Sequence, residues 1–541
     1  MKKKLLLLGD EAIALSAINA GISGVYAYPG TPSTEITEYI QGNAAAKENG
    51  VTCRWCTNEK TAMEAALGVS YVGRRAIVCM KHVGMNVAAD AFVNSGITGA
   101  NGGIVVVAAD DPSMHSSQNE QDSRFYGKFA FIPVLEPSSQ QEAYDMMKFG
   151  LELSEKMQTP VLMRITTRMA HSRAVVEVDT EVEQHKEISF PENARGWILL
   201  PAISKKKYVK VLENYEELGH MAEESKFNQY TDGEDKSMGI IACGIAYNYL
   251  MENMPEGCKN PVLKISQYPF PKKLIAKMAA ECKSILVLEE GQPILEEYLR
   301  GILDNGIKVM GRLSGEVPRT GELNADYIKP ALGLGEIPSE VLSPVVVNRP
   351  PALCMGCGHR DVYTALNQVL ADYPNHRVFS DIGCYTLGAL PPFQAIHSCV
   401  DMGASITMAK GAADAGLFPS VAVIGDSTFT HSGMTGLLDA VNSKASVTVV
   451  ISDNLTTGMT GGQDSAGTGK FEKIVEALGV EPEHIRVVVP LAKNMPEITK
   501  IIREELEYRG VSVIIPRREC VQVFNRKAKA RKAAAAAAAR K

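Results

Sequence analysis

The chain has 541 residues, of which 45% are hydrophobic and 22% charged, and its formal net charge is −6. This balance is typical of an ordinary globular protein and gives no reason to expect nucleic-acid binding. No apolar run approaches the roughly 20 residues that cross a bilayer, so we expect no membrane segment. At about 150 residues a domain, the length predicts three or four domains.

The chain opens with Met1, three lysines, four leucines and Gly9-Asp10-Glu11. The apolar part is short for a signal peptide, and the residues that follow it do not form a small-residue cleavage site. We therefore expect a first β-strand that enters a helix, and a cytoplasmic protein. In a cytoplasmic chain, the 11 cysteines are expected to be metal ligands or free thiols and not disulfides.

Short apolar runs alternate with helical patterns in residues 1–185, which predicts an α/β domain with a doubly wound parallel sheet. The runs are Leu5–Leu8, Gly24–Ala27, Ala76–Met80, Ile104–Ala108 and Val161–Ile165. Residues 186–236 are polar and charged, and we expect a connecting segment with helical stretches. Residues 237–325 are predicted to form a second α/β domain. Its strands are expected at Met238–Ala242, Val262–Ile265, Ile285–Leu288 and Ile307–Met310.

Residues 326–351 are rich in proline and leucine and are predicted to be a linker. The third α/β domain is expected at residues 352–520. A basic, alanine-rich tail, residues 521–541, completes the chain, with seven positive charges from Arg526 onward. The tail is expected to be a solvated helix; the alternative is that it steers an acidic electron carrier or partner subunit.

Two predicted strands of the third domain each end in a short polar turn. Gly425-Asp426-Ser427 follows the apolar run Val421–Ile424, and Asp453-Asn454-Leu455-Thr456 follows Val447–Ile451. Open α/β sheets bind their ligands at the carboxyl ends of parallel strands, so the two turns are expected to share a binding site. The plainer alternative is two ordinary strand-to-loop turns.

These turns carry the oxygen ligands that Mg²⁺ prefers. Asp426 offers a carboxylate, Asn454 an amide oxygen and Thr456 its backbone carbonyl, while a phosphate supplies further oxygens. Gly425 lets the backbone approach that phosphate. A Gly-Asp-Ser turn followed one strand later by Asn resembles the motif that binds thiamine diphosphate and Mg²⁺.

Thiamine diphosphate also needs a carboxylic acid beside its aminopyrimidine ring. This acid hydrogen-bonds a ring nitrogen and favours the imino tautomer, whose nitrogen can deprotonate the thiazolium C2. The candidate is Glu59, which lies between a predicted short strand and an alanine-rich helix. The alternative is that Asn58 simply caps the helix, with Glu59 in its first turn.

Six longer motifs extend the resemblance to nearly the whole chain. They are Tyr28–Glu35, Asn58–Lys60, Met80–Asp90, Pro350–Arg360, Gly425–Gly433 and Thr457–Gln463. Together they resemble the α subunits of indolepyruvate:ferredoxin oxidoreductases, within the 2-oxoacid:ferredoxin oxidoreductase superfamily. The resemblance implies a pyrimidine-binding first domain, a transketolase C-terminal-like second domain and a diphosphate-binding third domain. The two thiamine-diphosphate-binding domains would each be a doubly wound parallel sheet.

The resemblance also implies site residues in both thiamine-binding domains. Glu59 is implied to be the catalytic acid that activates the cofactor, and Thr31 to face the substrate end of the thiazolium. Lys81, His82 and Asn86 are implied to lie near the site, although a Lys-His pair on a loop is more often solvated. The cofactor-binding residues implied in the third domain are His359, Gly383, Cys384, Gly425, Asp426, Ser427, Asn454, Thr456 and Met459.

Cysteines of the third domain supply the four thiolates that one [4Fe–4S] cluster needs. They are Cys354 and Cys357, in a Cys-x-x-Cys pair, with Cys384 and Cys520. The superfamily holds a cluster close to the thiazolium with this arrangement. Cys399 is the competing fourth ligand, and zinc or buried free thiols are the alternatives to a cluster.

The implied activity is the oxidative decarboxylation of 2-oxo acids, with arylpyruvates such as indolepyruvate favoured. Coenzyme A takes the acyl group, and electrons pass through the cluster to ferredoxin or another electron-transfer protein. A smaller β subunit is implied as partner, in an (αβ)₂ assembly. The rivals are a non-oxidative thiamine-dependent decarboxylase and a non-catalytic subunit. The family's α subunits usually continue into a ferredoxin-like domain; here no cysteine follows Cys520, so we expect a separate protein to take the electrons.

Overall fold

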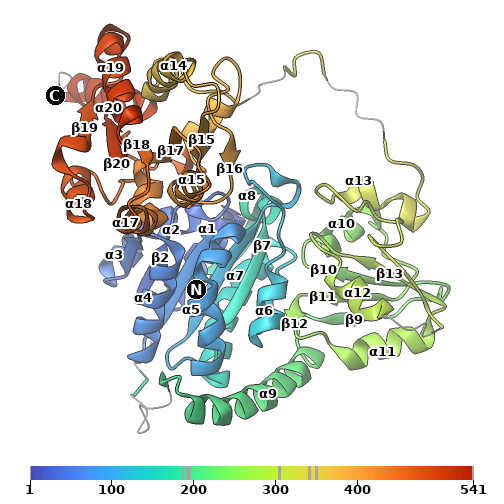
Figure 1. Cartoon of the computed structure of the whole chain (residues 1–541). Coiled ribbons are helices and arrows are strands. Elements are labelled where there is room, and N and C mark those ends of the chain that lie inside the picture. The colour runs from blue at the N-terminus through green and yellow to red at the C-terminus, as the bar shows by residue number, and fades with distance from the viewer. Residues whose placement is uncertain are drawn as a thin grey trace. The chain divides into compact units, whose positions relative to one another are not determined.

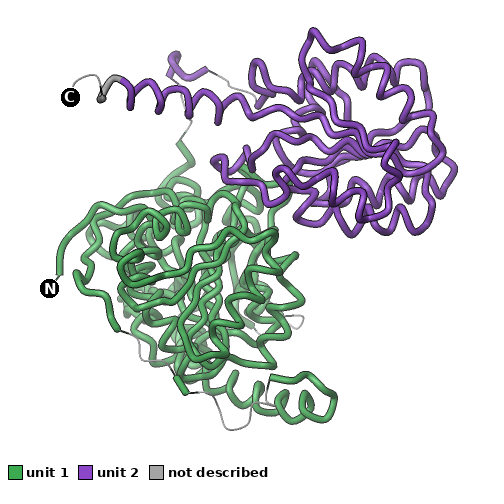
Figure 2. Tube along the Cα trace, turned by 90° about the vertical axis from the view of Figure 1, so that its left-hand side faces the viewer, with its two compact units in different colours: residues 1–341 green, residues 342–541 purple. Residues whose placement is uncertain are grey.

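A computed structural model of the chain describes residues 2–184, 188–189, 197–301, 306–338, 343–347 and 351–538 (Figure 1). The chain divides into two compact units, Met1–Val341 and Leu342–Lys541, which we call unit 1 and unit 2 (Figure 2). The expected connecting segment, linker and tail each fall partly outside the described residues.

Unit 1 contains a seven-stranded sheet in the order β12-β6-β7-β5-β4-β2-β3. Every pairing in it is parallel except that of β12 with β6. Its strands are β2 (Gly24–Ala27), β3 (Thr52–Trp55), β4 (Ala76–Lys81), β5 (Ile104–Asp110), β6 (Val134–Leu135), β7 (Val161–Thr166) and β12 (Gln267–Tyr268). β4, β5 and β7 are buried along their whole length, as parallel strands covered on both faces are.

Helices cover both faces of this sheet (Figure 1). Ile77 and Val105 face one core layer, while Val78 and Val106 face the other, because successive strand residues point to opposite sides. The first layer contains α1 (Gly9–Asn19), α2 (Thr34–Gly42) and α7 (Gln140–Met157), and the second contains α4 (Glu59–Tyr71) and α5 (His82–Thr98). The doubly wound arrangement predicted for this region is confirmed.

The first strand does not join the parallel sheet. β1 (Lys2–Leu8) pairs antiparallel with β8 (Arg173–Asp179) in a two-stranded ribbon. The prediction that Leu5–Leu8 belongs to the parallel sheet is therefore wrong. Leu7 is buried, but Leu6 is 60% exposed, so the apolar run is a half-covered ribbon and not a core strand.

The second sheet of unit 1 has five strands in the order β14-β13-β10-β11-β9, and only β9 is antiparallel. Its strands are β9 (Gln229–Thr231), β10 (Gly239–Cys243), β11 (Val262–Ile265), β13 (Ser284–Leu288) and β14 (Lys308–Met310). The four strands expected in this region are thus present. The expected connecting segment contains a long helix, α9 (Pro201–Glu223).

Buried charges join the two sheets of unit 1. Arg124 donates from Nη1 to Glu289 Oε2 at 3.0 Å. Arg164, on β7, donates from Nε to Asp110 Oδ2 at 2.7 Å and from Nη2 to the Glu290 carbonyl at 3.0 Å. Both arginines are buried, and charges buried in this way need such partners to be tolerated.

Unit 2 is built on a six-stranded, wholly parallel sheet in the order β16-β15-β17-β18-β20-β19. Its strands are β15 (Arg377–Ser380), β16 (Ser398–Cys399), β17 (Ser420–Gly425), β18 (Val447–Ser452), β19 (Ile485–Val488) and β20 (Val511–Pro516). One face is covered by α14 (Gly358–Leu370) and α19 (Met495–Glu507), and the other by α15 (Ala404–Asp414), α17 (Met434–Asn442) and α18 (Phe471–Ala477). A further helix, α20 (Val521–Ala538), forms most of the basic tail.

The described helices include none with the combined length and hydrophobicity of a membrane span.

Candidate functional site

The two polar turns of unit 2 meet at the carboxyl edge of its sheet. β17 and β18 are direct neighbours; Asp426 begins the helix after β17, and Asn454 follows β18. The backbone N–H of Thr456 donates to Asp426 Oδ2 and to Asn454 Oδ1, each at 3.1 Å. One amide therefore holds together the two side-chain oxygens expected to bind magnesium.

Asp426 is a buried carboxyl, 2% exposed. Burial, with like charge from Asp453 beside it, raises the pKa of Asp426 to about 7. The Asp453 carboxylate is itself paired, since Arg517 Nε donates to its Oδ2 at 2.6 Å. A divalent cation favours the ionised form of Asp426, and a set of carboxylate, amide and carbonyl oxygens suits Mg²⁺. The residues present fit a magnesium ion.

Leu455 gives the second turn its shape. Its φ is +64°, in the left-handed region that non-glycine residues rarely adopt. Holding a leucine there costs about 1–2 kcal/mol, which the surrounding hydrogen bonds must offset. The conformation places the Asn454 side chain and the Thr456 amide face to face. Nothing in the sequence singles out this leucine.

Two glycines of the candidate cofactor site face one aromatic ring. A Cβ on Gly383 or on Gly425 would lie 2.5 Å from Cε1 of Tyr385, so neither position admits a side chain while that ring stays in place. Ser427 Oγ lies 2.9 Å from Thr457 Oγ1.

His359 and Met459 were also expected in this site. Nε2 of His359 lies 3.4 Å from Nδ2 of Asn454. Burial lowers the pKa of His359 to about 4, so its ring is neutral at pH 7 and accepts a hydrogen bond from the amide. The His359 ring therefore orients Asn454. Met459 is 49% exposed, in a short 3₁₀ helix at Gly458–Thr460.

The expected cluster ligands of unit 2 line one cavity. The residues that line it include Cys354, Cys357, Cys384 and Cys520, together with His359 and Asn454. A Cβ on Gly458 would lie 3.4 Å from the sulfur of Cys384 and 3.9 Å from that of Cys520, so both sulfurs flank one glycine. Cys520 also donates its backbone N–H to the Asn454 carbonyl at 3.0 Å. The cysteine cavity and the magnesium turn thus share Asn454.

The electrostatics of this cavity suit a metal cluster. Burial and the neighbouring sulfurs of Cys520, Cys357 and Cys354 raise the pKa of Cys384 to about 12. Without a metal the thiolate is therefore disfavoured, whereas iron would stabilise it, and four cysteines are the number that one [4Fe–4S] cluster needs. Cys399 lies apart, on the edge strand β16 near Thr386 and Asp381. In the described part of the chain, Cys520 and not Cys399 completes the set around the cavity.

In unit 1, Glu59 is the first residue of α4 but does not face solvent. Asn58 caps the helix by accepting the Thr61 N–H at 2.9 Å, as the plainer interpretation predicts. Glu59 is nevertheless only 6% exposed, because its side chain turns toward α5. A Cβ on Gly84 of that helix would lie 2.7 Å from Glu59 Cγ and Oε1. The absent side chain of Gly84 thus makes room for the Glu59 carboxyl.

Thr31 and Lys81 occupy the ends of neighbouring strands. Thr31 lies in the loop after β2, and Lys81 is the last residue of β4, which pairs with β2. The adjoining Gly30 packs on Lys81, since a Cβ there would lie 3.1 Å from Lys81 Cβ. Lys81 donates from Nζ to the Ser116 carbonyl at 2.7 Å, and burial lowers its pKa to about 8.

His82 is the first residue of α5, and Asn86 lies one turn further along it. His82 is buried, and its Nε2 lies 3.1 Å from the Asn119 carbonyl. Its Nδ1 is buried without a hydrogen-bond partner among the described residues. Asn86 is exposed and accepts a hydrogen bond from the Tyr126 hydroxyl. The alternative of a solvated Lys-His pair does not hold, because both side chains are buried. The pair also does not lie on a loop, since Lys81 ends β4 and His82 begins α5.

Sequence reasoning missed Gly84, Leu455 and Tyr385. A signal existed for Gly84, because a glycine inside a helix is costly unless something needs the space. Tyr385 and Leu455 carry no such signal, since their importance lies in contacts made between separate loops.

Family models match two parts of the chain. Residues 16–228 match "Pyruvate flavodoxin/ferredoxin oxidoreductase, thiamine diP-bdg", and residues 381–515 match "Thiamine pyrophosphate enzyme, C-terminal TPP binding domain". The first of these regions contains Glu59, and the second contains Asp426 and Asn454.

Relatives match the chain over most of its length. Indolepyruvate oxidoreductase subunit IorA of Methanothermobacter thermautotrophicus is 38% identical, over 96% of this chain and 87% of that protein. The IorA subunit of Pyrococcus abyssi is 39% identical, over 96% and 86%. A solved 2-oxoglutarate:ferredoxin oxidoreductase from Magnetococcus marinus is 18% identical, with a TM-score of 0.48 over 57% of this chain and 62% of that one.

Proposed function

The chain belongs to the family of indolepyruvate oxidoreductase subunits IorA, and we propose that it catalyses the oxidative decarboxylation of arylpyruvates. In the balanced reaction, a 2-oxo acid and coenzyme A give an acyl-CoA, CO₂ and a proton, and two electrons leave for ferredoxin or a similar carrier. The name of the IorA relatives supports indolepyruvate as a substrate. A smaller β subunit is the proposed partner, in an (αβ)₂ assembly.

Residues of unit 2 hold the diphosphate in this proposal. Asp426, Asn454 and the Thr456 carbonyl bind Mg²⁺, and the backbone at Gly425 and Ser427 lies against the phosphates. The Thr456 amide supports this role, because it holds the two side-chain oxygens in register. His359 fixes the orientation of Asn454. Bound thiamine diphosphate supplies the carbon nucleophile and accepts the electron pair released when CO₂ leaves.

Glu59 of unit 1 provides the acid for the aminopyrimidine ring. Its burial keeps water away from the carboxyl, and Gly84 fixes where the side chain lies. Thr31 contacts the substrate end of the cofactor. Lys81, held against the Ser116 carbonyl, places a cationic group at the same sheet edge, where a 2-oxo acid brings its carboxylate.

The cysteine cavity supports the proposal that the reaction is oxidative. A simple decarboxylase needs no electron acceptor, whereas four cysteines around one cavity, which shares Asn454 with the magnesium turn, fit a [4Fe–4S] cluster. The residues that would hold this cluster are Cys354, Cys357, Cys384 and Cys520, and the bound cluster would supply the one-electron acceptor that oxidation needs. This arrangement is the single observation that favours an oxidoreductase over a non-oxidative enzyme.

The test is anaerobic purification of the chain with its partner subunit. Iron per chain is measured first, and then the reduction of a viologen dye by aromatic and aliphatic 2-oxo acids with and without coenzyme A. We expect about four iron atoms per chain, as one [4Fe–4S] cluster requires, and dye reduction that is fastest with arylpyruvates. Aldehyde and CO₂ formed without iron or dye reduction would instead identify a non-oxidative decarboxylase.

A matched pair of variants assigns the magnesium site. Asp426→Asn should abolish Mg²⁺-dependent binding of thiamine diphosphate while leaving the iron content unchanged. Asp439→Asn, at an exposed position of α17, should change neither property. Retention of cofactor affinity in Asp426→Asn would refute the assignment.

A further inference from the structure

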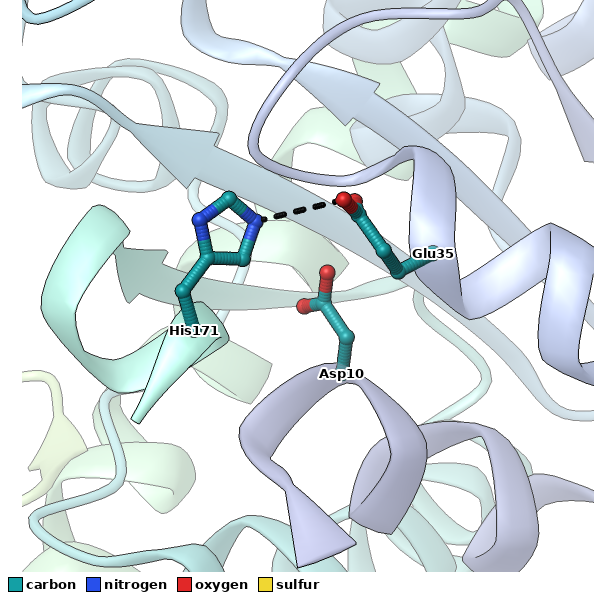
Figure 3. A group of neighbouring side chains, drawn as sticks. All are labelled: Asp10, Glu35 and His171. Carbon is teal, nitrogen blue, oxygen red and sulfur yellow. Dashed lines mark ion pairs between the residues drawn. The ribbon is translucent and has the colours of Figure 1, made fainter. Parts of the chain in front are cut away.

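A second group of metal-ligand side chains lies in unit 1, outside the proposed thiamine site. Asp10 comes from the first turn of α1, Glu35 from the first turn of α2, and His171 from the end of α8 (Thr167–His171). One ligand atom from each residue lies within 4.8 Å of the other two. Figure 3 shows the Asp10 carboxylate directed into the space between Glu35 and His171.

The carboxylate oxygens of this group lack protein partners. Asp10 is fully buried, and neither of its oxygens has a hydrogen-bond partner among the described residues. Oε2 of Glu35 is likewise buried and unpaired within the described chain. Three such oxygens around one point are costly, at about 1–3 kcal/mol for each unsatisfied buried group.

Protonation does not remove this cost. A neutral Asp10 would still need an acceptor for its O–H, and the described residues provide none. On the opposite side, His171 Nε2 lies 3.5 Å from Glu35 Oε1. A cation at the centre satisfies both carboxylates and the imidazole together.

We propose that Asp10, Glu35 and His171 bind a divalent first-row metal ion, of the kind represented by Mn²⁺ and Zn²⁺. Two carboxylates and one imidazole suit these ions, and three protein ligands leave a coordination position for water. Asp10 is the inner ligand, while the Glu35 and His171 side chains are 38% and 34% exposed and leave an entry path. The ion would fasten three helices that are separate in sequence.

The position of Glu35 gives this site a consequence for the rest of unit 1. Glu35 is the second residue of α2, and the loop that carries Thr31 runs directly into this helix. A metal ion on Glu35 would therefore anchor the carboxyl end of that loop to α1 and α8. Its expected role is to position the loop and stabilise unit 1, and not to take part in catalysis.

The test measures Mn²⁺ binding to the full chain, purified anaerobically with its cluster and without thiamine diphosphate. Free Mn²⁺ is followed by electron paramagnetic resonance, with Zn²⁺ competition as a second arm. The Asp426→Asn background removes the other proposed divalent site. We expect this variant to keep one Mn²⁺ site, and Asp10→Asn introduced into it to weaken binding at least tenfold.

His171→Gln is the fallback if Asp10→Asn does not fold, because His171 is half-exposed. His220→Gln, at an exposed position of α9, is the matched control and should bind as its parent does. Mn²⁺ should also raise the Tm of the Asp426→Asn protein but not that of its Asp10→Asn derivative. Absence of a Mn²⁺ or Zn²⁺ site in Asp426→Asn, or its persistence in both ligand variants, would overturn the proposal. Neither result bears on the thiamine site.

Discussion

The candidate site residues of unit 1 and unit 2 are assembled in different ways. In unit 2, two short motifs follow adjacent strands, and β17 and β18 pair directly. In unit 1, single residues come from the ends of β2, β3 and β4, and the chain between them folds into separate helices. The candidate site residues of unit 2 can therefore be predicted from local sequence, whereas those of unit 1 are brought together only by the strand order.

The two units also hold their key carboxyls differently. Asp426 receives a backbone N–H from Thr456, so a neighbouring loop fixes its position by hydrogen bonding. Glu59 lies against a glycine of the next helix, so its position depends on packing. We therefore expect the position of Asp426 to withstand changes outside its motif. The position of Glu59 should be sensitive to a single methyl group added beside it.

The largest effect is expected for the cysteines of unit 2. Cys384→Ser should abolish dye reduction and lower the iron content, because a cluster cannot keep its four thiolate ligands. Cys399→Ser should leave both unchanged, since Cys399 lies on β16, away from the cavity wall. If Cys399→Ser lost iron and activity while Cys384→Ser kept both, the assignment of Cys384 as a cluster ligand would be wrong. The candidate site of unit 2 could then not be predicted from its motifs.

The next effect concerns Glu59 of unit 1. Glu59→Gln should lower kcat by about 10²–10⁴-fold, the range for loss of a positioned acid–base group. Affinity for thiamine diphosphate should be largely kept, because the diphosphate is assigned to unit 2. Glu64→Gln, on the exposed face of the same helix, is the control and should keep full activity. An active Glu59→Gln protein would leave unit 1 without its proposed role.

A smaller change tests whether packing positions Glu59. Gly84→Ala places a methyl group 2.7 Å from the Glu59 side chain and should displace it. An overpacking cost of about 1–3 kcal/mol, if it is lost from the transition state, corresponds to a fall in activity of roughly 5- to 160-fold. Gly68→Ala is the matched control, because nothing lies within 4 Å of its added Cβ. That change should keep activity and stabilise α4 by up to about 1 kcal/mol.

Equal activity of the Gly84→Ala and Gly68→Ala proteins would show that Glu59 does not depend on its neighbour. The contrast between a hydrogen-bonded unit 2 and a packed unit 1 would then be lost.

Much of the fold could be predicted, because buried parallel strands are continuous apolar runs. The runs at Ala76–Met80 and Val447–Ile451 are strands in the structure. Leu5–Leu8 looks the same in sequence but forms a half-covered ribbon, since an apolar run does not reveal which strand will pair with it. Strand pairing is a long-range property, and periodicity reports only local structure.

The candidate site was predictable to the extent that its residues form motifs. Asp426 and Asn454 follow from strand ends, but Glu59 needed the family resemblance, because one acid after one strand is not distinctive. Gly84 and Leu455 were missed, since their roles come from contacts with other segments. Asp10 and His171 are 161 positions apart in sequence and meet only in the folded unit.

The smallest predicted effect concerns a residue that has a shifted pKa but lies outside the candidate site. Burial raises the pKa of Glu290 in unit 1 to about 7, as it does for Asp426 in unit 2. Glu290 is not part of the candidate site; it accepts the Leu323 N–H at 3.0 Å beside the buried charges that join the two sheets. A pKa above the ordinary value means that the folded protein holds this proton more tightly than the unfolded chain.

Unit 1 should therefore lose stability as pH rises from about 4.5 through 7, by about 1–3 kcal/mol from Glu290, and the loss should be complete by about pH 8. Glu290→Gln should remove this part of the slope and leave dye reduction unchanged. Denaturant unfolding at pH 5 and pH 8 measures it, and fluorescence reports unit 1 alone because both tryptophans, Trp55 and Trp197, lie there. Asp381→Asn in unit 2, where burial also raises the pKa of the carboxyl to about 7, should not alter that signal. An unchanged slope in Glu290→Gln would mean that the Glu290 carboxyl is ionised in the folded protein, held by the arginines around it.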